Sequence, residues 1–147
     1  MKKILINFIV AISLLCACSI TTKAQSVVME ITWNVYITYK GLMVTYPNNT
    51  GIFVVQYWNP DLQQNVRVVQ DVSVRNQFDI YGNCTSFLNC FNPKSYPYTA
   101  YSADNFIIYP NGSMYAQDYA GNWSTAIMAQ VINPALWRSK FKEYGLE

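Results

Sequence analysis

VTYPNNTGIFVVQY, from Val44 to Tyr57, returns in shortened form as IIYPNGSMYAQDY, from Ile107 to Tyr119. Both copies run from an apolar segment through Tyr-Pro-Asn into a second segment that ends in Tyr. Proline presets φ for a turn and needs no hydrogen-bond acceptor, and Asn49 and Gly112 tolerate the positive φ that tight hairpins require. Each copy therefore predicts a β-hairpin.

Alternation of apolar and polar residues predicts strands on both sides of these turns. In residues 29–39, apolar side chains fall at every second position, which is the period of a half-buried strand. The same period appears in residues 66–74. The core residues that this alternation predicts include Trp33, Val35, Val68 and Val72.

Turn residues divide the rest of the chain into further strands. A turn at Lys40-Gly41 is expected to end the first strand. The remaining predicted strands are residues 42–46, 52–58, 66–74, 78–81, 105–109, 113–119 and 123–132. Segments 42–74 and 105–132 form two related three-strand meanders, each of which needs a second layer over its apolar face. The predicted fold is all-β, with about eight antiparallel strands in a small barrel or sandwich.

One short helix is expected at the C-terminus, over residues 134–144. Asn133 is suited to the N-cap, Pro134 to the first helical position, and Gly145 to the C-cap. Aromatic residues at spacings of four and three form a stripe that should pack on the sheet or close a barrel end. These residues are Trp137, Phe141 and Tyr144.

The first 24 residues have the pattern of a secretory signal peptide. Lys2 and Lys3 precede an apolar run over 4–15 that is too short to span a bilayer. Cleavage after Ala24 would leave a single domain of residues 25–147. In the alternative, the LCAC stretch acts as a lipoprotein signal, and lipidation of Cys18 tethers the domain to a membrane. Both alternatives predict an exported protein, at the cell surface, in the periplasm or secreted, and the short Lys-Lys signal is typical of bacteria.

Removal of the signal changes the charge balance. The whole chain has ten Lys and Arg against eight Asp and Glu, but three of the lysines lie in residues 1–24. The remaining domain carries a net charge of about −1, so nucleic acid is not an expected partner, and a membrane is expected only if Cys18 is lipidated.

The remaining cysteines and the absence of histidine limit the chemistry that we expect. In an oxidising compartment, Cys84 and Cys90 most simply form a disulfide. The chain has no histidine, which removes imidazole acid–base catalysis and histidine metal ligands. No pair of carboxylates or phosphate-binding loop stands out. We therefore expect no enzyme activity, no metal site and no cofactor.

Residues 83–104 show no strand pattern and are expected to form a long loop held by the disulfide. Aromatic side chains are frequent in it, and they suit recognition because tyrosine buries a large amphipathic surface at small entropic cost. The candidate binding residues are Phe91, Tyr96, Tyr98 and Tyr101. In the alternative interpretation, the same rings form a lid over the open end of the core.

These features favour an exported, non-catalytic binding protein that recognises a glycan, a peptide or a protein surface through the aromatic loop. One alternative is an envelope assembly protein that adds an edge strand, such as residues 30–39, to a partner sheet. Another is an inhibitor that inserts the loop between Cys84 and Cys90 into a target enzyme. The motifs identify no family.

Overall fold

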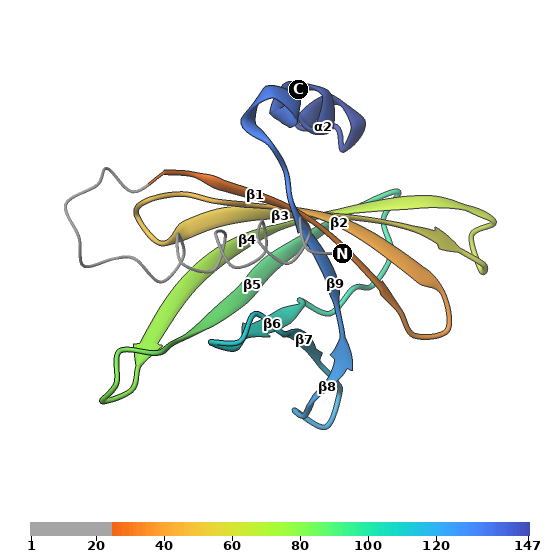
Figure 1. Cartoon of the computed structure of the whole chain (residues 1–147). Coiled ribbons are helices and arrows are strands. Elements are labelled where there is room, and N and C mark those ends of the chain that lie inside the picture. Colours follow the sequence, from red (N-terminus) through yellow and green to blue (C-terminus); the bar gives the residue numbers. More distant parts are fainter. Residues whose placement is uncertain (1–24) are drawn as a thin grey trace.

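A computed structural model describes residues 25–147, which form one nine-stranded antiparallel sheet and a short C-terminal helix (Figure 1). From β1 to β8, each strand pairs with the next one in the sequence. The strands are β1 (Val27–Asn34), β2 (Thr38–Thr45), β3 (Thr50–Asn59), β4 (Gln64–Phe78), β5 (Cys84–Tyr96), β6 (Asn105–Ile108), β7 (Met114–Gln117), β8 (Trp123–Ala126) and β9 (Met128–Val131). A 3-10 turn, η1 (Pro134–Leu136), leads into the helix α2 (Trp137–Glu143).

The two ends of the sheet meet because β8 and β9 are halves of one bent strand. Only Ile127 separates them, and β8 pairs with β7 while β9 pairs with β1. The sheet is therefore nearly closed into a barrel, and β9, which pairs with β1, leads on to the helix (Figure 1). The all-β prediction is confirmed, and the two predicted meanders are β2–β4 and β6–β8 of this one sheet.

Aromatic rings fill the centre of the barrel. The Phe53 and Phe106 side chains are fully buried, with ring centroids 5.2 Å apart in an edge-to-face arrangement, and Trp33 packs edge-on against Phe106 at 5.8 Å. Val68 and Val72 are also buried, so three of the four predicted core residues are confirmed. The other buried residues of this cluster are Val27, Met29, Ile31, Met43, Val55, Tyr57, Val66, Leu88, Cys90, Ile108, Met114 and Ala116.

The two Tyr-Pro-Asn turns have the same structure. The first and last residues of each turn are joined by a backbone hydrogen bond, of 2.8 Å in 46–50 and 2.9 Å in 109–113. The left-handed position is Asn49 in one turn, at φ 62°, and Gly112 in the other, at φ 92°. Both predicted hairpins are confirmed.

A second pair of turns, DIYGN at 79–83 and DYAGN at 118–122, also share one structure. In each, the Asp carboxylate accepts hydrogen bonds from two backbone amides within the turn, at 2.8–2.9 Å. The first turn follows the third strand of its meander and the second follows the second strand of its meander. The Asp turns therefore occupy different places in the two meanders, so the two pairs of turns are not parts of one repeated unit. Local hairpin chemistry accounts for their recurrence.

The predicted strand over 29–39 is divided in the structure. A tight turn at residues 35–37 separates β1 from β2, and the Thr38 hydroxyl donates to the Asn34 side chain across it, at 2.7 Å. Val35 is 57% exposed in this turn, so its assignment to the core was wrong. The predicted turn at Lys40-Gly41 was also wrong, because both residues lie within β2.

The predicted loop over 83–104 is largely a strand. Residues 84–96 form β5, which pairs with β4 and β6, and only residues 97–104 connect it to β6. The predicted strand over 78–81 is instead the end of β4 and the 79–83 turn. The sequence of β5 lacks a clean alternation of apolar and polar residues. The polar Ser86 points inward, whereas the apolar Phe87 packs outside against Trp123 and Arg75.

The predicted disulfide is contradicted. Cys84 and Cys90 are both free and buried. They lie six residues apart on one strand, which separates them by about 20 Å at roughly 3.3 Å per residue. A disulfide needs Cα atoms within about 7 Å, so the extended strand keeps the two thiols apart.

The C-terminal helix packs on the outer face of the sheet (Figure 1). The Asn133 side chain accepts from the Ala135 amide at 2.9 Å, but it caps the 3-10 turn η1, so the α-helix begins at Trp137 and not at Pro134 as predicted. Gly145 adopts φ 70° after the end of the helix, as predicted. The aromatic stripe is confirmed as a packing face: its members lie against apolar side chains of β1–β4. No helix within residues 25–147 is long and apolar enough to cross a membrane. The predicted signal peptide and lipidation at Cys18 lie outside the described residues.

Candidate functional site

A row of side chains crosses four strands on the outer face, beyond the C-terminal end of α2. Strand register aligns Lys40 on β2, Gln56 on β3, Arg67 on β4 and Tyr96 on β5. Their neighbours along the strands, including Tyr57, belong to the interior cluster, so alternation turns this row outward.

The next row, toward the 60–63 turn, completes a groove. Trp58 on β3 pairs with Asn65 on β4, and Thr38 on β2 lines the same groove. The groove has a volume of about 460 Å³ and is lined by both rows together with Tyr57 and Val66. Trp58 and Tyr96 lie on the two strands that flank β4, about 10 Å apart across the sheet. Between them lie Asn65 and Arg67, so two aromatic side chains border a polar, cationic floor.

Both charged residues of the groove are cations. The Arg67 guanidinium lies over the Tyr96 ring, 5.3 Å from its centroid, and donates to the Gly145 carbonyl at 2.7 Å. Within residues 25–147, neither Arg67 nor Lys40 forms a salt bridge. An arginine carries five N–H donors, so the Gly145 contact leaves donors for a ligand.

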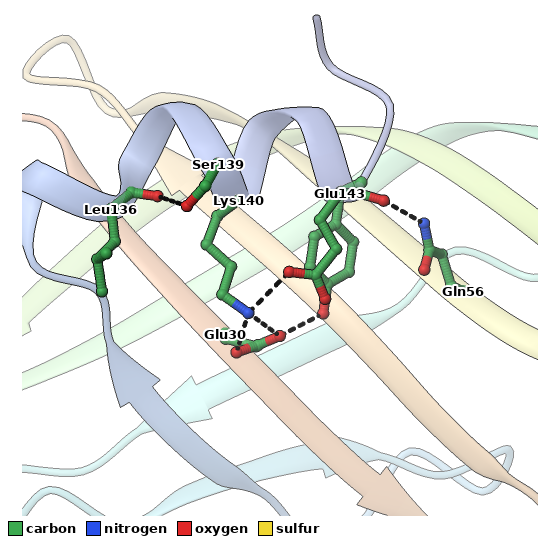
Figure 2. A network of polar contacts seen from close by, with 7 residues as sticks. Glu30, Gln56, Leu136, Ser139, Lys140 and Glu143 are labelled. Carbon is green, nitrogen blue, oxygen red and sulfur yellow. Dashed lines mark hydrogen bonds and ion pairs between the residues drawn. The ribbon is translucent and has the colours of Figure 1, made fainter.

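Glu30 on β1 and Glu143 on α2 form salt bridges with a cation outside the groove, Lys140. Figure 2 shows Lys140 between two carboxylates, Glu30 at 3.0 Å and Glu143 at 2.9 Å. The Tyr144 hydroxyl donates to Glu30 at 2.8 Å. Burial raises the pKa of Glu30, but the bonds from Tyr144 and Lys140 outweigh burial and hold the pKa below its ordinary value. This network fixes the helix on the sheet, and Lys40 acts on Glu30 only through longer-range attraction, without a salt bridge.

Gln56 connects the helix anchor to the groove. Its side-chain amide donates to the Glu143 backbone carbonyl at 3.2 Å, as Figure 2 shows. Together with the Arg67–Gly145 bond, this contact positions two groove residues against the end of α2. The helix therefore orders one wall of the groove.

The four predicted binding residues do not form one surface. Tyr96 is 53% exposed and lines the groove, while Tyr98 is 88% exposed in the connection that follows β5. Phe91 lies farther along β5, opposite Asp71. Tyr101 packs inside against the core, with its ring 5.9 Å from that of Tyr57. Tyr101 therefore packs on the core, whereas Phe91, Tyr96 and Tyr98 are exposed.

Tyr101 belongs to a polar cluster inside the barrel end. Its hydroxyl donates to Asp104 at 3.0 Å, and the buried Gln70 amide donates to the same carboxylate at 2.6 Å. The Asp104 backbone N–H donates to the side-chain oxygen of Gln70 at 2.9 Å. Burial raises the pKa of Asp104 to about 6, although both donors favour its charged form. Burial, together with the Asp104 charge, also raises the pKa of the Tyr101 phenol. All groups of this cluster are partnered within the fold.

Of the residues that line the groove, sequence reasoning identified only Tyr96, and it missed the charged and aromatic residues Lys40, Trp58 and Arg67. Each occupies an outward position of an alternating strand, and the alternation around Arg67 was visible in the sequence. Their assembly depends on the pairing register of β2–β5, which alternation alone does not define. The clearest sequence signal was Trp58, a large aromatic residue at an outward position beside a turn.

In the part of the chain that the structure covers, no group of three or more Cys, Asp or Glu side chains is placed to hold a metal ion. The expectation that the protein uses no metal or cofactor stays a prediction.

The fold and groove define an antiparallel, barrel-like β domain with a helix on its outer face and an aromatic, cationic groove beside that helix. Comparison of the chain with protein-family models, curated protein sequences and solved structures finds no match.

Proposed function

We propose that this protein is an exported, non-catalytic binding protein that recognises a glycan in the groove between Trp58 and Tyr96. The observation that supports it most directly is the pair of exposed aromatic side chains, 49% and 53% exposed, on either side of a polar floor. Large pockets lined by aromatic side chains with a few polar groups are typical of binding sites.

The chemistry of the groove matches that of a sugar. One face of a pyranose ring presents C–H groups, which pack on an aromatic ring, while its hydroxyls need hydrogen-bond partners. Gln56, Asn65 and Thr38 offer amide and hydroxyl groups on the same surface. An aromatic wall with a few placed polar groups is the usual composition of a small-ligand site.

The groove favours binding over catalysis because its lining contains no carboxylate or thiol to act as acid, base or nucleophile. Export remains a prediction based on residues 1–24. The two alternatives lose the structural elements on which they depended. Strand β1 is paired on both sides and is no free edge, and the segment between Cys84 and Cys90 is a paired strand.

A panel of neutral and acidic oligosaccharides tests the proposal directly. We expect the exported protein to bind at least one member, and Trp58→Ala and Tyr96→Ala each to weaken that binding. Tyr81→Ala is the matched control, because Tyr81 is an exposed aromatic residue in the 79–83 turn, away from the groove. Failure of the unaltered protein to bind any oligosaccharide would contradict the proposal, as would equal loss of binding in the control.

A further inference from the structure

We infer that the groove takes an acidic oligosaccharide, with a carboxylate of the sugar held by Arg67 and a second one by Lys40. This inference rests on the proposed glycan binding and adds the class of sugar. It depends on the two cations of the groove, whereas the proposed function depends on the two aromatic side chains.

Arg67 is positioned before a ligand arrives. Its guanidinium is held from one side by the Tyr96 ring and from the end by the Gly145 carbonyl. The Gly145 bond uses one N–H, and the remaining donors form the planar fork that matches a carboxylate. Because the guanidinium is already ordered, it loses little side-chain entropy on binding, and this raises its affinity for an anionic ligand.

Lys40 lies on the same cross-strand row, two strands from Arg67, with only Gln56 between them. Two strand spacings separate their backbones by about 10 Å. An oligosaccharide with repeated acidic sugars presents carboxylates at intervals along its length, and it can satisfy both. Trp58 and Tyr96 then contact the rings that carry them.

The electrostatic surroundings support an anion. Glu30 and Glu143 both form salt bridges with Lys140, and Lys40 attracts Glu30 only at longer range, without a direct carboxylate contact within the described residues. Asp71, four residues after Arg67 on β4, accepts a hydrogen bond from the Asn92 side chain at 3.1 Å, and Asp61 lies in the turn between β3 and β4; neither lines the groove. The domain as a whole carries a slight negative charge, so the two cations are a local feature and not part of a general basic surface.

Oligogalacturonate and its fully methyl-esterified form test the inference, because they share one backbone and differ in the charge of the carboxyl groups. Calorimetric titration of the exported protein should show the acidic form binding about ten-fold more tightly or better, with affinity falling as ionic strength rises. Arg67→Gln and Lys40→Gln should each remove most of this preference, and Arg67→Lys should restore only part of it.

Arg75→Gln is the control. Arg75 is an outward residue of the same strand and also stacks on an aromatic ring, that of Phe87 at 4.2 Å, but it lies outside the groove. It should leave the preference unchanged. Lys40→Gln distinguishes loss of charge from loss of structure. Unlike Arg67, Lys40 makes no side-chain hydrogen bond or salt bridge within the described residues, so its replacement removes no structural contact of that kind.

Equal binding of the two forms, or a preference unaffected by Arg67→Gln and Lys40→Gln, overturns the acidic-sugar inference and leaves glycan binding in place. Binding of neither form, nor of any other oligosaccharide in the panel, overturns both the inference and the proposed function.

Discussion

Gly41 lies directly beneath the ring of Phe53, which belongs to the neighbouring strand. A Cβ atom on residue 41 would overlap the edge of that ring and would also come within 3.3 Å of the Ile31 side chain. Phe53 has no exposed surface and packs against Trp33 and Phe106, so it has no free space into which to move. Residue 41 is therefore a glycine, although it lies inside a strand, because the Phe53 ring occupies the space that a side chain would need.

Gly41→Ala should destabilise the domain by about 1–3 kcal/mol, as overpacking of a filled core does. Chemical denaturation followed by fluorescence measures the change. Adding Phe53→Leu should recover part of the loss, so that the double variant is more stable than the sum of the single effects predicts. A neutral Gly41→Ala variant would show that the ring has space to move.

Asp104 should make the stability of the domain depend on pH. Its pKa is about 6 in the folded protein against an ordinary 3.8, so the folded state retains a proton that the unfolded state releases. Its contribution is therefore complete below pH 3.8 and is lost as pH rises through 6, by up to roughly 3 kcal/mol. We expect the melting temperature of the unaltered protein, relative to that of Asp104→Asn, to fall between pH 4 and pH 7.

The exposed Asp61→Asn variant is the control for this measurement and should follow the unaltered protein. If the difference between the unaltered protein and Asp104→Asn is constant over this pH range, the buried carboxylate is not the titrating group.

Tyr144→Phe tests the anchor of the helix. It removes only the hydroxyl that donates to Glu30, while the ring remains to pack on the sheet. A bond to a charged, partly buried acceptor contributes about 1–2 kcal/mol, and the variant should lose that amount at neutral pH. The pKa of Glu30 is lowered from 4.5, so the loss should shrink only at pH values below this, where Glu30 becomes protonated. Tyr81→Phe, in an exposed turn, should have no effect.

The thiols of Cys84 and Cys90 should both be free in the exported protein. A thiol reagent should modify two groups after unfolding and should react slowly with the folded protein, because both side chains are buried and burial raises the pKa of Cys90. Intact mass after alkylation in denaturant counts the groups. A protein that remains unalkylated and two hydrogens lighter would contain the disulfide that strand β5 excludes.

Local patterns in the sequence were sufficient for the two Tyr-Pro-Asn turns, the presence of the C-terminal helix and the class of fold. The Tyr-Pro-Asn turns and the capped helix depend on residues that lie within a few positions of each other, so their chemistry is visible in the chain. Strand β5 was missed because the polar Ser86 points inward while Phe87 and Phe91 point outward, which interrupts the apolar–polar alternation of a half-buried strand. Gly41 was read as a turn because its packing partner, Phe53, lies on another strand.

The candidate groove was only partly predictable for the same reason. Tyr96 was identified from the aromatic content of its segment, but its partners Arg67 and Trp58 belong to other strands and are placed beside it by pairing register. A single-residue shift in that register would turn Arg67 inward and remove the floor of the groove.

The most direct test of glycan binding in the groove uses the four tryptophans, which lie in four different places. Trp58 is in the groove, Trp33 is in the barrel interior, Trp123 packs on Phe87 outside the barrel, and Trp137 is on α2 with its indole N–H donating to Ile132. An NMR titration with the oligosaccharide of the panel that binds most tightly follows all four indole N–H signals at once. We predict that the Trp58 signal shifts with ligand concentration while the other three stay in place. A shift of Trp33 with Trp58 unmoved would contradict the account, since the ligand would then lie inside the barrel.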